Sequence, residues 1–372
     1  MVAPKLSDRQ RLQWLRLIRT SNVGPASFRE LINRFGSAEA ALEALPELTA
    51  RGGARRSARI PSILEVETEY EAVQRIGARL VAVGEADYPP LLAHVDNPPP
   101  ILTVLGSAEC FARNSVSIVG ARNASMAGIN FARKLAFDLG GHDWVVSSGF
   151  ARGIDTAAHK GAMQSGTIAV LAGGISRPYP SENVPLMREI VDKGGAFICE
   201  MPFGWEPRPQ DFPRRNRIIA GLSLGLVVIE AAVRSGSLIS ARMAGEMGRT
   251  VFAVPGSPLD PRAAGTNGLL KQGATLVTCA DDVVEQLTPM LGTSSQAPQF
   301  DEALEYDHAP SCCEDDRARL IGLLGPSPAP IDDLIAHSGI HPANVQMILL
   351  ELDLAGRLER HPGGQVALVD FG

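Results

Sequence analysis

The feature that most constrains this chain is an alternation of short apolar runs with helical stretches between residues 115 and 277. Each apolar run is nearly continuous and is followed by small and polar turn residues, a pattern typical of strands buried on both faces. The predicted strands are Val116–Val119, Trp144–Val146, Thr167–Leu171, Ala196–Cys199, Leu226–Ile229, Thr250–Val254 and Thr275–Val277. The predicted intervening helices include Ile129–Leu139, Asp155–Gln164, Val184–Lys193 and Ser240–Met247.

This order predicts an α/β fold with a Rossmann-like, doubly wound, mostly parallel sheet. Right-handed crossovers between parallel strands place helices on both faces, and ligands bind beyond the carboxyl ends of the strands. Aromatic residues make up only 5% of the chain, while Gly and Pro number 37 and 27, so aliphatic side chains must build the core. A length of 372 residues indicates more than one domain.

Two smaller modules are predicted beside the sheet. Before it, two helical stripes flank a turn at Asn22–Pro25, which resembles helix-hairpin-helix or sterile-alpha-motif-like modules. Such a module either meets a phosphate backbone through its turn amides and Arg29 and Arg34 or serves only as a helical cap. After the sheet, three predicted helices and strands around Pro362–Gly364 follow the winged-helix plan. The expected domains are 1–80 (helical), 81–290 (Rossmann-like), 291–313 (linker) and 314–372 (winged helix).

The charge distribution limits how the chain can meet nucleic acid. The net charge of −6 divides into +4 for residues 1–80, −1 for 81–290 and −9 for 291–372. A uniformly basic binder is excluded, although a local basic surface is not. The last predicted helix of the winged-helix module has no Lys or Arg, which favours a structural or protein-contact role over DNA reading.

The remaining composition predicts a soluble, cytoplasmic protein. No stretch has the length and apolarity of an export signal or a membrane span. The five cysteines form no CxxC pair and have no histidine at zinc-ligand spacing, so we expect neither a metal nor a cofactor.

Three strand ends carry residues suited to anions. Gly120 and Arg122 follow the first predicted strand, where an approaching helix offers free N–H groups. The second strand runs into Ser148 and Gly149, with Arg152 and Lys160 close behind. Ser235 and Gly236 follow a third strand.

The segment Pro209–Ser223 is the most informative. It predicts a helix with Pro213 near its start, so that Arg214, Arg215 and Arg217 crowd the positive end of the helix dipole. An external phosphate would make that placement favourable, and Phe212 would stack a base. Alternatively, the arginines bridge acidic neighbours and Phe212 is a hydrophobic staple. His159 is predicted to be a hydrogen-bonded helix residue, because no nucleophile motif accompanies it.

Together, these motifs resemble the DprA/Smf family, the DNA-processing proteins of natural transformation. The resemblance covers about Leu80–Leu287 and rests on Ile118–Arg122, Ser148–Asp155 with Ala158 and His159, Thr167–Gly173, Tyr179–Pro180, Phe212–Ser223, Glu230, Ser235–Leu238 and Val254–Gly256. It implies a protein that is not an enzyme, binds and protects incoming single-stranded DNA, loads the RecA recombinase, and forms a homodimer through the Rossmann-like domain. The predicted DNA-binding residues are Gly120, Arg122, Ser148, Gly149, Arg152, Lys160, Phe212, Arg214, Arg215, Asn216, Arg217, Ser235 and Gly236, with no catalytic residue and no metal ligand.

An enzyme is the alternative interpretation. Rossmann-like phosphoribohydrolases similar to lysine decarboxylases also bind phosphate at strand ends, but their Pro-Gly-Gly-x-Gly-Thr motif is not matched by Pro255-Gly256-Ser257-Pro258. A winged-helix transcription regulator is disfavoured by the uncharged third helix of that module.

Overall fold

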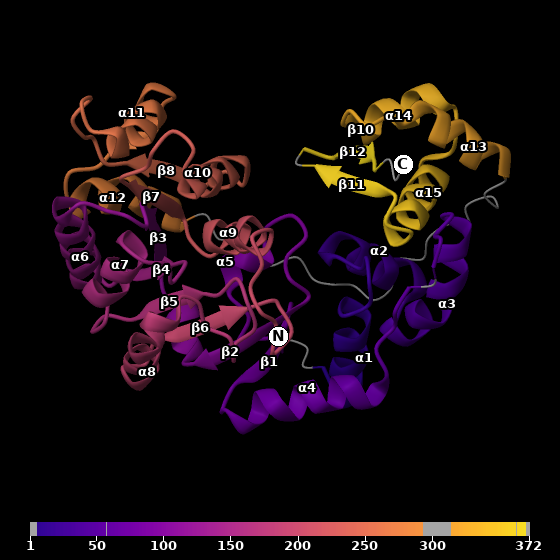
Figure 1. Ribbon diagram of the computed structural model, residues 1–372, viewed down its shortest axis with the longest axis horizontal. Coiled ribbons are helices and arrows are strands. Elements are labelled where there is room, and N and C mark those ends of the chain that lie inside the picture. The colour runs from indigo at the N-terminus through magenta and orange to yellow at the C-terminus, as the bar shows by residue number, and fades with distance from the viewer. Residues whose placement is uncertain (1–5, 57, 293–313, 362, 370–372) are drawn as a thin grey trace. The chain divides into compact units, whose positions relative to one another are not determined.

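The computed structural model describes residues 6–56, 58–292, 314–361 and 363–369. These residues fall into two compact units, each visible in Figure 1. The first, here called the sheet unit, spans residues 68–292, and the second, the terminal unit, combines residues 6–67 with residues 314–369.

The sheet unit is built on a nine-stranded sheet with the order β1-β2-β6-β5-β4-β3-β7-β8-β9. Its strands are β1 (Arg79–Ala82), β2 (Ile101–Gly106), β3 (Ser115–Gly120), β4 (Val145–Ser148), β5 (Thr167–Val170), β6 (Ala196–Cys199), β7 (Gly225–Ile229), β8 (Thr250–Ala253) and β9 (Thr275–Leu276). All pairs from β6 to β9 are parallel, while β1 and β2 pair antiparallel at one edge. The seven predicted strands are confirmed; β1 and β2 were not predicted.

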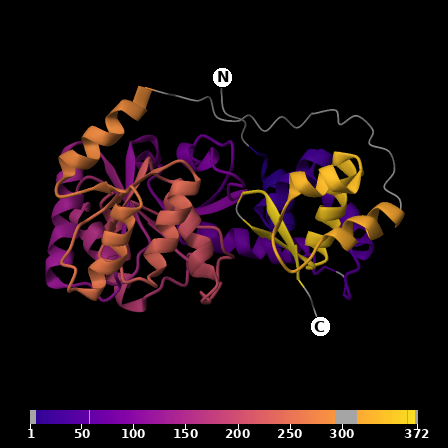
Figure 2. The ribbon, with the colours of Figure 1, turned by 90° about the horizontal axis from the view of Figure 1, so that it is seen from above.

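Helices cover both faces of this sheet, which confirms the doubly wound prediction (Figures 1 and 2). Helices α6 (Met126–Gly141), α7 (Ile154–Gly161) and α12 (Ala280–Leu287) share one core cluster with the strands. Helices α9 (Asp211–Gly221) and α10 (Gly236–Glu246) pack together against strands β5, β7 and β8. The unit also contains α5 (Pro90–Ala93), α8 (Val184–Asp192) and α11 (Ala264–Lys271).

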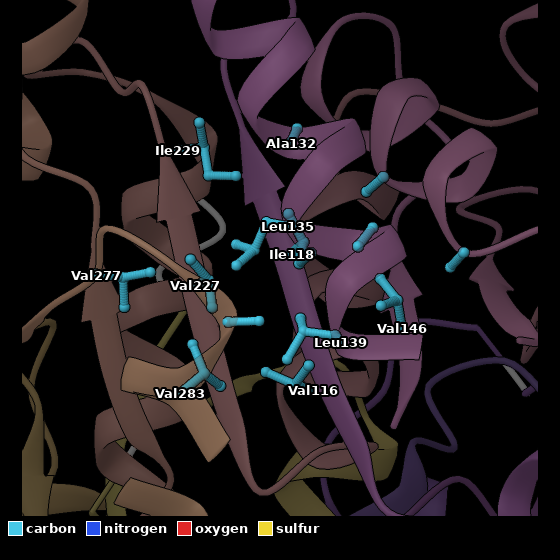
Figure 3. Close-up of a cluster of buried hydrophobic side chains, with 14 of the residues drawn as sticks. Val116, Ile118, Ala132, Leu135, Leu139, Val146, Val227, Ile229, Val277 and Val283 are labelled. Carbon is cyan, nitrogen blue, oxygen red and sulfur yellow. The ribbon is translucent and has the colours of Figure 1, made fainter. Parts of the chain in front are cut away.

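The core beneath α6 shows why these residues form this layer. Val116 and Ile118 are two residues apart on β3, so their side chains point to the same face of the sheet. There they meet Leu135 and Leu139 of α6, as Figure 3 shows. Each of these side chains is at most 1% exposed. Burying an aliphatic side chain contributes about 1.5–3 kcal/mol, so this cluster is a main source of the unit's stability.

The terminal unit joins two modules that are far apart in sequence. Its helices are α1 (Asp8–Ile18), α2 (Pro25–Phe35), α3 (Ala38–Arg51), the start of α4 (Ile63–Arg75), α13 (Glu314–Leu323), α14 (Ile331–Ser338) and α15 (Pro342–Leu354). A small sheet orders β10 (Ala329–Pro330), β12 (Gln365–Leu368) and β11 (Leu358–His361). The predicted helical module and winged helix are confirmed, and β10 was not predicted.

Helix α15, which would be the DNA-reading helix of a winged helix, packs against α2 and α3 of the helical module. Nine of its 13 residues are buried. This helix is therefore occupied by intramolecular packing, as its lack of basic residues suggested.

The predicted domain boundaries need one adjustment. Strand β1 crosses the expected boundary between residues 80 and 81, and we propose that the sheet domain begins before Arg79. Most of the predicted linker, residues 293–313, lies outside the described residues. Among the helices that the structure describes, none is long and apolar enough to cross a membrane.

Candidate functional site

A cavity of about 340 Å³ opens where strands β3 and β4 end. It is lined by Arg122, Asn123, Gly149, Ala151, Arg152, Tyr179, Pro180 and Phe212. Four predicted site residues, Arg122, Gly149, Arg152 and Phe212, are thus brought to one place. This is the edge where doubly wound sheets bind their ligands.

Arg122 and Phe212 are in direct contact at this cavity. The Arg122 guanidinium carbon lies 5.0 Å from the centre of the Phe212 ring, which is a cation–π distance. Tyr179 meets the same ring edge-on, with ring centres 5.7 Å apart. An exposed cation and two aromatic rings therefore meet at the mouth of the cavity.

Helix α9 carries Phe212 and is fixed at both ends. At its start, the Asp211 carboxylate accepts hydrogen bonds from Trp205 Nε1 and Arg208 N, each at 2.8 Å. Near its end, the buried Ser117 hydroxyl donates to Ile219 O at 2.8 Å. Phe212 is consequently presented by a rigid element rather than by a free loop.

The arginines of α9 diverge. Arg214 and Arg217, one helical turn apart, both bind Glu200, which is 8% exposed; Arg214 Nε lies 3.0 Å from Oε1. Arg217 also donates to Asn97 O at 3.2 Å. The predicted alternative, that these arginines bridge an acidic neighbour, therefore holds for both residues, and Glu200 offsets part of their charge.

Arg215 turns the other way and is only 5% exposed. It donates to Gly149 O and, at 2.9 Å, to Val170 O. Burial lowers the pKa of Arg215 to about 10, so it remains charged at neutral pH. Our prediction that Arg215 contacts a ligand directly is not compatible with this burial, and the side chain supports the β4 turn from below.

The β4 turn is also held by Asp155. Its carboxylate accepts hydrogen bonds from the backbone N–H groups of Gly149 and Ala151, at 3.1 and 3.2 Å. Burial raises the pKa of Asp155, and the nearby Arg215 opposes that shift. A Cβ on Gly149 would collide with Arg215 Nη1, so the turn requires glycine here.

Two further predicted residues, Ser148 and Gly120, have roles inside the sheet unit. The Ser148 hydroxyl is fully buried and donates to Ile118 O at 2.6 Å, so it links β3 and β4 instead of facing a ligand. A Cβ on Gly120 would collide with Ile229 O and approach Ile154 Cγ1 at 2.7 Å. Gly120 is thus needed for internal packing, and its contact with a phosphate stays a prediction.

Two backbone N–H groups at the amino end of α6 are already hydrogen-bonded within the protein. The Glu230 carboxylate accepts a hydrogen bond from Ser125 N at 2.8 Å and from the Ser125 hydroxyl. Ser125 Oγ in turn accepts from Gly128 N at 3.0 Å. An internal carboxylate therefore occupies the anion position of this helix.

Apart from Arg152, the remaining predicted residues are not part of the cavity lining. Arg152, which does line it, binds Glu182 through Nη2 at 2.7 Å. Asn216 Nδ2 donates to Gly236 O at 3.3 Å, which ties the Ser235–Gly236 turn to α9. Lys160 is exposed on α7.

His159 has the structural role that the sequence predicted. It is fully buried, and its Nδ1 lies 2.7 Å from Thr167 Oγ1. Burial lowers the pKa of His159 to about 3, so the ring is neutral under ordinary conditions.

Sequence reasoning missed Asn123, Ala151, Tyr179 and Pro180 in the lining, and Glu182 and Glu200 behind the arginines. The Tyr179–Pro180 pair was noted in the resemblance, so a signal for it existed. The two glutamates had no local signal, because each meets its arginine only after folding. Among the described residues, no three His, Cys, Asp or Glu side chains are grouped as metal ligands.

A Rossmann-like sheet with a cationic, aromatic strand-end cavity, accompanied by helical and winged-helix modules, defines a class of DNA-processing proteins. Family comparisons agree along the chain. The model for DNA recombination-mediator protein A matches residues 79–288, the DprA-like N-terminal HHH domain matches 8–72, and the DprA winged helix domain matches 303–364. The chain belongs to the DprA/Smf family.

Relatives match over most of their length. Protein Smf of Escherichia coli is 36% identical, over 82% of this chain and 81% of the relative. A putative DNA processing protein DprA of Mycobacterium tuberculosis is 34% identical, over 94% of this chain and 92% of the relative.

Solved structures agree with the fold of the sheet unit. DprA of Streptococcus pneumoniae aligns with a TM-score of 0.62 at 28% identity, covering 76% of this chain and 99% of that one. DprA of Helicobacter pylori, described for its single-stranded DNA binding mode, aligns with a TM-score of 0.52 at 25% identity, over 57% of this chain and 96% of that one.

Proposed function

We propose that the protein binds single-stranded DNA across the strand-end edge of the sheet unit. The observation that carries this proposal is the contact between Arg122 and Phe212 at the mouth of the cavity. A guanidinium fork suits a backbone phosphate, and an aromatic ring suits an unstacked base. A single strand offers both groups within one nucleotide, whereas the bases of a duplex are already stacked.

The path of the strand would follow the remaining arginines. Arg152, Arg214 and Arg217 are cationic and at least partly exposed, and each now binds a carboxylate. A phosphate can replace Glu182 beside Arg152, because that ion pair is exposed and contributes little in water. Arg215, Asp155, Ser148 and Gly120 hold this surface in place from within.

We also propose, from family membership, that the protein loads RecA onto the bound strand and acts in the cytoplasm. The measurement is RecA filament assembly on single-stranded DNA with and without the protein. Equal assembly in both samples would contradict this part alone.

A homodimer through the sheet unit is a further part of the proposal. Leu276 on the outer strand β9 is 50% exposed, and Val233 is also exposed, so apolar surface is available for a second copy. Light scattering of the full chain, compared with a Leu276→Glu variant, tests it: the variant should be monomeric. A monomeric unmodified protein would contradict it.

A binding role without catalysis fits the site better than hydrolysis does. His159, the strongest candidate base near the cavity, is buried and bonded to Thr167. Release of base or phosphate from nucleotides by the purified chain would support the enzyme alternative instead.

The direct test is binding of labelled single- and double-stranded oligonucleotides over a salt series. We expect preference for the single strand with a steep salt dependence, weakened by Arg122→Ala and Arg217→Ala. Equal affinity for single- and double-stranded DNA, or an affinity that does not change with salt concentration, would contradict the proposal.

A further inference from the structure

The terminal unit contains a cavity of about 600 Å³ that the proposed DNA path does not use. Its lining comes from three separated segments: Ser21 and Asn22 after α1, residues 53–56, 58 and 59 after α3, and Ala355, Arg357 and Val369 of the winged-helix module. A volume of this size is typical of small-ligand sites.

The charge of this lining is one-sided. Arg55, Arg56, Arg59 and Arg357 contribute four guanidinium groups, and none of the described lining residues is acidic. Glu65, which is not in the lining, binds Arg59, with its Oε1 at 2.6 Å from Nη2, so it offsets part of this charge. The lining is therefore positively charged, although residues 291–372, which contribute Arg357, carry a net charge of −9.

Hydrogen bonds between and within the two modules hold the residues that line the cavity in place. Asn22 Nδ2 donates to Leu354 O at 3.1 Å, and Arg357 Nη1 donates to Gly52 O at 3.1 Å. Ser21 N donates to Arg59 O at 3.2 Å. The cavity is therefore defined by the packing of the helical module on the winged helix, not by one loose loop.

Glycine is required where the walls meet. Gly53 has a φ of +77°, and a Cβ there would lie 2.8 Å from Arg357 Nη1. A Cβ on Gly52 would collide with Glu351 O. These two glycines let the end of α3 approach α15 closely enough for Arg357 to join the arginines of the 53–59 segment.

Internal contacts occupy α15 and part of the hairpin turn, the two other places where this unit could meet DNA. Helix α15 is packed against α2 and α3. In the hairpin turn, Ser21 N, Val23 N and Gly24 N already donate to Arg59 O, Thr20 O and Ser27 Oγ. The arginine-lined cavity, by contrast, presents its charge outward, since Arg55, Arg56 and Arg59 are exposed.

We propose that this cavity is a second anion site, which binds adjacent phosphate groups through Arg55, Arg56 and Arg357. Guanidinium groups bind phosphate oxygens in pairs, so several around one cavity favour a ligand with two or more phosphates. A nucleoside triphosphate and consecutive nucleotides of a strand share this chemistry. The proposal does not depend on DNA binding by the sheet unit.

The test uses the full chain with Arg122→Ala and Phe212→Ala, which weaken binding at the proposed site of the sheet unit. Inorganic tripolyphosphate, ATP and a 20-nucleotide oligothymidylate are titrated by calorimetry. Adding Arg55→Ala and Arg56→Ala should weaken binding at least about tenfold, the effect of losing one charge-assisted hydrogen bond or more. Both side chains are exposed, so the fold should survive.

Two matched variants complete the experiment. Arg9→Ala with Arg51→Ala removes the same charge from exposed positions of this unit outside the cavity, and binding should not change. Arg55→Lys with Arg56→Lys keeps the charge without the fork and should retain part of the affinity.

The probes separate the two sources of phosphate. Binding of tripolyphosphate and ATP indicates a nucleotide-sized ligand, whereas binding of the oligonucleotide alone indicates a strand. If none of the three binds, or if the Arg55 and Arg56 variants bind as well as the unaltered cavity, the proposal is wrong.

Discussion

The guanidinium of Arg122 lies over the ring of Phe212, 5.0 Å from its centre, although one residue comes from the turn after β3 and the other from the first turn of α9. Since α9 and β3 are joined through the buried Ser117 hydroxyl, this contact is built into the sheet unit. It places a guanidinium group and an aromatic ring at one point of the surface, where the proposed function needs a phosphate contact and a base platform.

Phe212→Ala should weaken single-stranded DNA binding. Loss of one stacking platform costs about 1–3 kcal/mol, which is about 5- to 150-fold in affinity. Fluorescence anisotropy with a labelled oligonucleotide measures it. Phe137→Ala is the matched control, because Phe137 is 65% exposed on α6 outside the cavity. Equal losses in both variants would argue against a stacking role.

Arg122→Ala should reduce the salt dependence of binding as well as the affinity. Removing one phosphate contact lowers the slope of log K against log salt by about 1. The exposed Arg133 on α6 provides a control that changes the same charge. A slope that falls as much in Arg133→Ala would mean that only overall charge matters.

Glu200→Gln should strengthen DNA binding. The carboxylate now binds Arg214 and Arg217, so its neutral isostere leaves both guanidinium groups more available to phosphate. We expect an affinity about three- to tenfold higher at low salt, and less at high salt because of screening. Glu246→Gln, at an exposed position of α10, is the control. Weaker binding by Glu200→Gln would indicate that the carboxylate orients the arginines for DNA.

Arg215→Ala should destabilise the sheet unit strongly. The substitution leaves Gly149 O and Val170 O without this donor and removes the cation nearest to Asp155. Loss of one partner from a buried charged network costs about 3–5 kcal/mol. Denaturant unfolding measures it, and Arg214→Ala, whose ion pair is partly exposed, should cost less than about 1 kcal/mol. If the two substitutions lowered the free energy of unfolding by similar amounts, the structural role of the buried Arg215 would be contradicted.

Because of His159, we expect the free energy of unfolding to fall in acid. Its pKa is lowered from 6.5 to about 3 in the folded protein, so its contribution is complete above pH 6.5 and is lost as pH falls from there towards 3. Each pH unit in that window costs up to about 1.4 kcal/mol.

The variant His159→Leu should remove that part of the pH dependence. Thr167 keeps its hydrogen bond to Val146 O in this variant, so the hydroxyl is not left unsatisfied. Unfolding curves between pH 3 and 7 measure the effect, with the exposed His94→Leu as control. An unchanged pH profile in His159→Leu would place the acid sensitivity elsewhere.

The parallel part of the fold could be predicted because strands buried on both faces leave nearly continuous apolar runs. Strands β1 and β2 lie at the antiparallel edge, on either side of a Pro-rich segment, and gave no such signal. The packing of the winged helix on the N-terminal helices could not be predicted from the sequence either. It depends on contacts such as Asn22 with Leu354, which no local pattern records.

At the site, the sequence identified which residue types matter but not which way each side chain points. Arg214 and Arg217 are three residues apart and share a face of α9, whereas Arg215 faces the sheet. Helical spacing contained this distinction, but which face meets solvent is decided by tertiary packing. Glu200 and Glu230 acquired their roles only through contacts across the fold.

The contact between Glu230 and Ser125 distinguishes this protein from dinucleotide-binding proteins with a similar sheet. In dinucleotide-binding Rossmann folds, the pyrophosphate sits at the start of the first crossover helix. Here the Glu230 carboxylate accepts hydrogen bonds from Ser125 at the start of α6, so a free nucleotide would have to compete with a carboxylate of the protein itself. The start of α6 is therefore occupied by a side chain of the protein itself, and under the proposed function the DNA strand binds instead at the neighbouring cavity of Arg122 and Phe212.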